Sequence, residues 1–120
     1  MSKIFDFKEV YVWQKAHQLV LAIYSITKKY PKDELYSLTS QMRRAAISVP
    51  ANFVEGFQRK GVKDEKHFYN IAQGSLAELQ YFILLSKDLG YIEEIHHNKL
   101  HDLSIEVSKL LYSWIESTKD

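Results

Sequence analysis

The chain has 120 residues, the length of one domain, and its 46% hydrophobic and 26% charged residues are typical of a globular protein. It contains no cysteine, which excludes a disulfide framework, a thiolate metal site and a cysteine nucleophile, and is typical of a reducing compartment. The formal net charge of +1 excludes nucleic-acid binding through overall charge. No run of about 18 uncharged apolar residues occurs, and residues 1–7 do not form a secretory signal, so we expect a cytoplasmic protein without a membrane span.

Glycine and proline, which end helices, divide the chain at Pro31, Gly61 and Gly90. After an N-terminal tail (residues 1–9), apolar residues recur at steps of three and four, the spacing of amphipathic helices. The predicted helices cover 10–29, 34–58, 62–89 and 92–117. Because the connections are short, consecutive helices should run antiparallel. We therefore predict an all-α fold, an antiparallel up-down-up-down four-helix bundle over residues 10–118.

The second predicted helix has an unusual interior and a defined start. Asp33 lies where its side chain would cap the first turn. Pro50 falls inside the apolar pattern, although proline in a helix interior costs about 3 kcal/mol. Because the pattern continues through Phe53 and Phe57, we predict one kinked helix. The alternative is two shorter helices that meet at Val49.

The third predicted helix has more apolar residues than one core-facing stripe requires. The predicted stripe consists of Phe68, Ala72, Ser75, Leu79, Phe82, Ser86 and Leu89. Residues 81–85 are consecutive and apolar, so they point almost all round the helix axis. Tyrosines suited to interfaces lie beside the predicted stripes, at Tyr11, Tyr24, Tyr69 and Tyr81. Either the helix is fully covered within a monomer or its second apolar face packs on another subunit, and we predict self-association.

Three polar residues lie on or beside the apolar stripes. Asn52 lies on the stripe of the second helix, and Glu55 and Glu78 are close to stripes. Since a buried polar group needs a partner, Arg43 or Arg44 could supply a charge. We predict that Asn52, Glu55 and Glu78 form a structural polar network that fixes helix register and subunit geometry. A ligand-binding or catalytic role for the same residues is the alternative.

Positive side chains gather near the connection between the second and third helices. The candidates for contact with RNA or DNA are Arg43, Arg44, Arg59, Lys60, Lys63 and Lys66. In a ring of subunits such a patch would repeat around the axis and hold a phosphate backbone without reading bases. The alternative is a solvated helix end, whose charge Asp64 and Glu65 dilute.

The start of the fourth helix resembles a metal site only in part. Glu93 with His96, and Glu94 with His97, have the Glu-x-x-His spacing of di-iron bundles, but that site requires a second copy on another helix. His97 and His101 alone would hold only a stray ion. The sequence also has no phosphate-binding glycine loop and no nucleophile elbow. We therefore expect no metal, no cofactor, no catalytic residues and no enzymatic activity.

The segment QMRRAAISVPANFVEG, residues 41–56, resembles the four helix bundle protein family, whose members are found within intervening sequences of bacterial 23S ribosomal RNA genes. Further family-like motifs lie at 12–16, 34–38, 71–79 and 89–92, so the resemblance extends from about 5 to 117. One departure is Gly61, where the family tends to place a serine or threonine cap.

The resemblance implies an antiparallel bundle that assembles into a ring-shaped homo-oligomer, typically a homopentamer. Related bundles that serve diversity-generating retroelements bind nucleic acid and a reverse transcriptase, although they are more basic than this chain. The resemblance therefore implies a non-enzymatic oligomeric scaffold or adaptor, with RNA, DNA or a nucleic-acid enzyme as partners. The alternative is a structural or protein-binding homo-oligomer without nucleic-acid contact.

Overall fold

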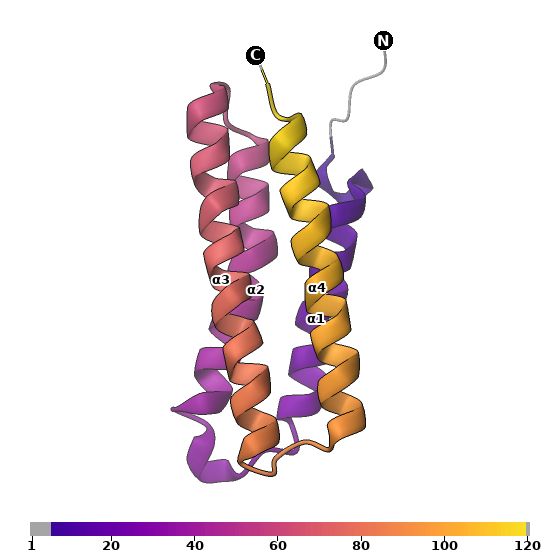
Figure 1. Cartoon of the computed structure of the whole chain (residues 1–120). Helices are drawn as coiled ribbons and strands as arrows, with labels where there is room; N and C mark the ends of the chain where they lie inside the picture. Colours follow the sequence, from indigo (N-terminus) through magenta and orange to yellow (C-terminus); the bar gives the residue numbers. More distant parts are fainter. Residues whose placement is uncertain (1–5, 120) are drawn as a thin grey trace.

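The computed structural model describes residues 6–119, which form four α-helices and two short 3₁₀ helices, without any strand (Figure 1). The elements are η1 (Phe7–Glu9), α1 (Tyr11–Thr27), η2 (Lys32–Glu34), α2 (Leu38–Phe57), α3 (Val62–Asp88) and α4 (Glu94–Ser117). The prediction of an all-α fold is confirmed. None of the helices in this part of the chain has the length and apolar character needed to cross a membrane.

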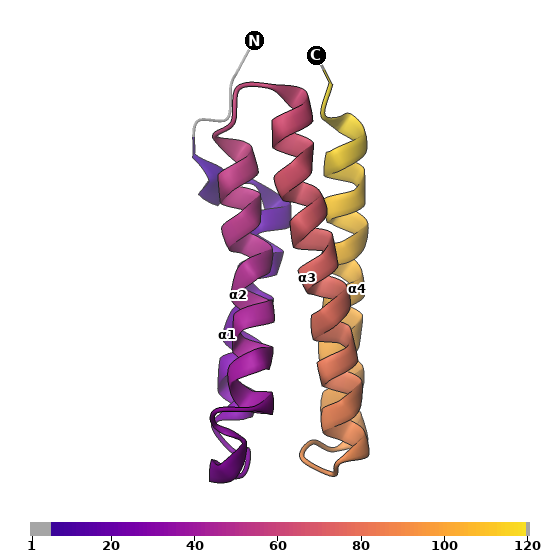
Figure 2. The same ribbon diagram turned by 90° about the vertical axis from the view of Figure 1, so that its left-hand side faces the viewer.

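The four helices stand side by side, and each runs antiparallel to the next (Figures 1 and 2). α1 packs against α2 and α4, and α3 packs against the same two helices, in a body of 49 × 25 × 19 Å. The start of α1, the end of α4 and the α2–α3 connection therefore lie at one end. The α1–α2 and α3–α4 connections lie at the other end (Figure 1).

α2 begins four residues later than predicted. Lys32–Glu34 form η2, a turn follows, and the helix starts at Leu38. Its preceding residue, Ser37, makes no side-chain cap hydrogen bond. The cap predicted at Asp33 is therefore wrong. α2 then continues through Pro50 to Phe57, which confirms one helix rather than two that meet at Val49.

The core-facing stripe of α3 differs from the predicted one. Its buried residues are Tyr69, Ala72, Leu76, Leu79, Ile83 and Ser86. The prediction was wrong for Phe68, Ser75 and Phe82, which are half-buried, and for Leu89, which is 49% exposed. The prediction placed Tyr69 beside the core, whereas it is 0% exposed. Three of the mispredicted residues directly precede core positions: Phe68 precedes Tyr69, Ser75 precedes Leu76 and Phe82 precedes Ile83.

Gly90 ends α3 as its sequence position predicts. Its φ of +81° is the left-handed conformation that glycine adopts without a steric cost. Gly90 N donates to Lys87 O, and Tyr91 N donates to Ser86 O, both at 2.9 Å. These two bonds satisfy carbonyl groups at the end of the helix and turn the chain toward α4.

Candidate nucleic-acid interface

The structure brings together four of the six predicted basic residues. Arg59 and Lys60 follow the end of α2, and Lys63 and Lys66 lie in the first two turns of α3. Arg43 lies sixteen residues before Arg59 on the sequence. At 1.5 Å of rise per residue this separates the two arginines by roughly 24 Å along the bundle. The candidate interface is therefore the α2–α3 connection without Arg43 and Arg44.

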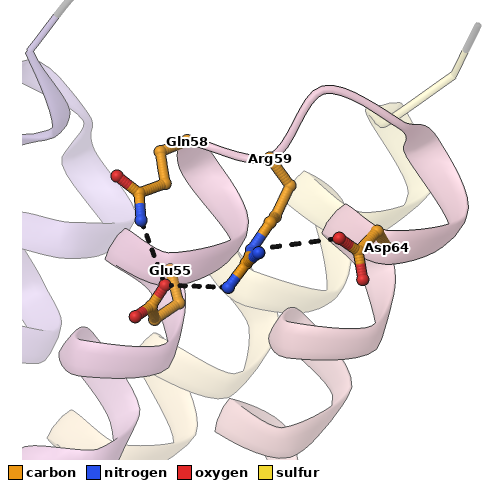
Figure 3. A network of polar contacts seen from close by, with 4 residues as sticks. All are labelled: Glu55, Gln58, Arg59 and Asp64. Atoms are coloured by element: carbon orange, nitrogen blue, oxygen red, sulfur yellow. Dashed lines mark hydrogen bonds and ion pairs between the residues drawn. The ribbon is translucent and has the colours of Figure 1, made fainter.

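Arg59 joins the end of α2 to the start of α3 (Figure 3). Its Nη2 lies 3.2 Å from Glu55 Oε2, and its Nε lies 3.9 Å from Asp64 Oδ2. Gln58 Nε2 donates to the same Glu55 oxygen at 3.1 Å. The guanidinium carbon is 4.5 Å from the centroid of the Phe68 ring. Arg59 thus has two carboxylate partners within the chain, and exposed pairs of this kind contribute at most about 1 kcal/mol to stability.

Lys60 and Lys63 are exposed. Within residues 6–119 no carboxylate lies within ion-pair distance of either ammonium group, and the same holds for the half-buried Lys66. From Glu55 to Lys66 the chain has four basic and three acidic residues, a local sum of +1. One subunit therefore presents only a weakly positive surface, and a strong potential requires several copies.

An aromatic cluster supports this end of the bundle. The ring of Tyr69 lies 5.3 Å from that of Phe53, and Trp114 of α4 lies 5.4 Å from Phe53. Tyr69 Oη donates to Glu65 Oε1 at 2.6 Å. Burial, and next the bond to this carboxylate, raise the pKa of the Tyr69 hydroxyl. Gly56 allows the close approach, because a Cβ at this position would lie 2.6 Å from the Tyr69 ring.

Arg43 and Arg44 lie toward the opposite end of α2, and only Arg44 is exposed. Arg43 is half-buried: its Nε donates to Thr27 Oγ1 at 3.0 Å, and its guanidinium carbon is 4.6 Å from the centroid of the Tyr24 ring. Arg43 therefore joins α2 to α1 and contributes nothing to the α2–α3 end.

The three residues of the predicted polar network are not brought together within the chain. Glu55 pairs with Arg59, and Glu78 is exposed without a hydrogen bond among residues 6–119. Asn52 is half-buried, and its Nδ2 donates to Ser48 O at 2.8 Å and to Ser48 Oγ at 2.9 Å. Ser48 Oγ lies 2.7 Å from Ser75 Oγ, which completes a hydrogen-bonded bridge from α2 to α3.

Sequence reasoning missed both serines of this bridge. Ser48 lies one helical turn before Asn52, so the i, i+4 spacing of two polar residues was the available signal. Ser75 carried no comparable signal, because a small residue in an apolar stripe equally indicates close helix packing. Its role depends on the position of α3 relative to α2.

The histidines at the start of α4 make few polar contacts. His96 Nδ1 lies 4.0 Å from Glu93 Oε1, and the rings of His97 and His101 stack with centroids 5.8 Å apart. Across residues 6–119, no group of three or more histidine and carboxylate side chains is close enough to hold a metal ion.

The fold and the charged end define the class of protein: a small four-helix bundle in which side-chain contacts join α2 to α1 and to α3. The family model of the 23S rRNA-intervening sequence proteins matches residues 8–113, and the chain belongs to this family. A similar solved structure is the crystal structure of a protein with unknown function from the S23 ribosomal protein family, from Bacteroides thetaiotaomicron VPI-5482. The two chains are 25% identical and superpose with a TM-score of 0.81, over 88% of this chain and 99% of the other. No curated protein matches the chain.

Proposed function

We propose that this protein is a cytoplasmic, non-enzymatic scaffold that assembles into a ring-shaped homo-oligomer, a pentamer as the family resemblance implies. Exposed apolar side chains along α3 carry the proposal. The large ones are Ile71, Tyr81, Leu84 and Leu89. Exposed apolar patches on a small protein mark interaction sites. A second copy of the chain is the partner to which we assign this surface.

The middle of α3 also favours a close neighbour. Gly74 is exposed, and apart from its chain neighbours and the backbone of its own helical turns, no atom of the described chain lies within 4 Å of the place where its Cβ would be. Glycine in a helix interior costs about 1 kcal/mol relative to alanine, and nothing in the chain requires it there. Close approach of another subunit to α3 accounts for this residue.

The mass of the assembly tests self-association. Light scattering coupled to gel filtration should give a multiple of 14.1 kDa at micromolar concentration. Ile71→Asp should shift the mass toward that of one chain, because a buried carboxylate without a partner is strongly unfavourable. Tyr36→Asp is the matched control, since Tyr36 is exposed in the α1–α2 connection, off the side of the bundle. A monomeric native chain would contradict the proposal.

In such a ring the α2–α3 ends of all subunits would gather Lys60 and Lys63 around one rim. We propose that this rim holds RNA or DNA by its phosphates and can present it to a nucleic-acid enzyme. Neither ammonium group has a carboxylate partner among residues 6–119, which supports this step. The carboxylates of Glu55 and Asp64 beside Arg59 favour the second candidate function, a structural homo-oligomer without nucleic-acid contact.

A gel-shift experiment separates the two candidates. At about 50 mM salt the native assembly should retard structured RNA or DNA, and the affinity should fall steeply toward about 200 mM. The variant Lys60→Glu/Lys63→Glu should lose this binding. Lys99→Glu/Lys109→Glu makes the same charge change on exposed positions of α4 and should retain it. Absence of any shift by the native assembly would favour the structural function.

A further inference from the structure

A separate cationic cavity lies at the opposite end of the bundle from the α2–α3 connection. The end of α1, the η2 segment and the first turns of α2 enclose a volume of about 270 Å³. Lys28, Lys32 and Arg43 line it, and no acidic residue of the described chain does. The volume is below that of cavities that hold drug-sized ligands, so it suits one small group. We propose that this cavity binds a phosphate monoester group.

Arg43 is fixed in position, while no carboxylate of the described residues pairs with its charge. Thr27 and the Tyr24 ring hold the guanidinium at the contacts described above, and Thr27 Oγ1 in turn donates to Ile23 O at 2.7 Å. Within residues 6–119, no carboxylate lies within 4.0 Å of Arg43, and its terminal nitrogens make no hydrogen bond. A half-buried guanidinium needs acceptors, and its planar fork matches two oxygens of a phosphate.

Other groups of the cavity favour the same kind of ligand. Lys28 and Lys32 are exposed and have no ion-pair partner among the described residues. Thr39, in the first turn of α2, is 3% exposed, and its Oγ1 has no hydrogen-bond partner there.

The nearest acidic side chains along the sequence do not fill the cavity. Glu34 Oε2 accepts a hydrogen bond from Tyr91 Oη at 2.6 Å, and Glu34 Oε1 accepts one from Leu38 N at 3.4 Å. Neither Glu34 nor Asp33 lines the cavity. A phosphate monoester carries a charge of about −1.5 to −2 near neutral pH, so it balances three cations better than a single carboxylate from another subunit would.

Calorimetric titration of the full chain with inorganic phosphate at low ionic strength tests the proposal. Because a hydrogen bond to a charged group is worth roughly one factor of ten in affinity, Arg43→Gln should weaken binding about tenfold. Arg44→Gln removes the neighbouring charge, which does not line the cavity, and should change the affinity by less than about twofold. Lys32→Gln removes a second cation of the cavity and should also weaken phosphate binding. Because Lys32 is exposed, this variant should fold even if Arg43→Gln does not.

The size of the assembly provides a second measurement. If Arg43→Gln dissociates the oligomer while the native chain takes up no phosphate, a carboxylate of another subunit occupies the cavity and the proposal is wrong. Unchanged phosphate affinity in both Arg43→Gln and Lys32→Gln would also overturn it. Lys60→Glu/Lys63→Glu should leave phosphate affinity unaltered, because those residues lie at the other end of the bundle.

The source of the phosphate is distinguished by a pair of oligonucleotides, one with a 5′-phosphate and one with a 5′-hydroxyl. Tighter binding of the phosphorylated form than of inorganic phosphate, lost in Arg43→Gln, supports a nucleotide end as the ligand. Equal binding of the two oligonucleotides, with inorganic phosphate still bound through Arg43, supports a free phosphate or a small phosphorylated metabolite.

Discussion

Replacement of Gly56 by alanine should destabilise the bundle, although alanine is the better helix former. A Cβ on Gly56 would lie 2.6 and 2.8 Å from two atoms of the Tyr69 ring and 2.9 Å from Glu65 O. Tyr69 is 0% exposed, packs on Phe53 and donates to Glu65 at 2.6 Å, so its ring has no space into which it can move. The Glu65 carbonyl belongs to the backbone of α3, and relief requires α2 and α3 to separate.

The magnitude follows from two opposing contributions. Overpacking of this kind costs about 1–3 kcal/mol, whereas glycine to alanine in a helix interior gains about 1 kcal/mol. We expect a net loss of about 1 kcal/mol, or a thermal midpoint lowered by about 4 °C. Urea unfolding followed by circular dichroism measures the free energy of unfolding, and a thermal melt of the same samples measures the midpoint.

Gly74→Ala is the matched control, because its Cβ would meet no atom of another described helix within 4 Å. In the dilute monomer it should raise stability by about 0.5–1 kcal/mol. Equal or greater stability of Gly56→Ala relative to the native chain would refute the reasoning about helix contact. Destabilisation by Gly74→Ala that disappears on dilution would instead place another subunit against α3.

Further predictions concern the polar contacts. Asn52→Ala should cost about 1 kcal/mol in urea unfolding, because it removes the bonds to Ser48, whereas exposed Asn70→Ala should change stability by less than about 0.5 kcal/mol. Glu78→Gln should likewise leave the stability of the dissociated chain unchanged, and a loss would show that Glu78 has a partner. The hydrogen bond to the Glu34 carboxylate, and next burial, raise the pKa of Tyr91 to about 12. This value exceeds the pKa of about 10 that tyrosine has in the unfolded chain. The contribution of the Tyr91–Glu34 bond to the free energy of unfolding is therefore complete below about pH 10 and is lost as pH rises through about 12. Tyr91→Phe should therefore show a shallower decline of the unfolding midpoint in this range than the native chain.

The sequence contained enough information for the number, type and order of the helices. The spacing of apolar residues and the positions of glycine and proline are local properties of the sequence. The turn at Gly90 formed where its position predicts. The start of α2 was harder to place, because Asp33 has the side chain of a cap while the chain first forms η2 and a turn. Local propensity does not distinguish these alternatives, since a distant contact, the hydrogen bond from Tyr91 of the α3–α4 connection to Glu34, contributes to the choice.

The partners of polar side chains were predicted least well. Arg43 was grouped with Arg59 because both are basic, yet the helix rise separates them, and Arg43 instead contacts Tyr24 and Thr27 of α1. Asn52 donates to Ser48, which is hydrogen-bonded to Ser75, and Glu78 takes no part in these bonds. Such pairings depend on the rotation of each helix about its axis.

Because the four helices alternate in direction, both ends of the described chain lie at the same end of the bundle. This matters for experiments in which the protein is attached to a surface. α1 begins and α4 ends at the end of the bundle that carries the α2–α3 connection (Figure 1). A tag or surface attachment at either terminus will therefore crowd Lys60 and Lys63, while the cavity around Arg43 stays open to solution. Binding sensors that immobilise the chain by its ends would weaken the signal of the proposed nucleic-acid binding but not that of the proposed phosphate binding. A tether placed in the α3–α4 connection is therefore the necessary complement.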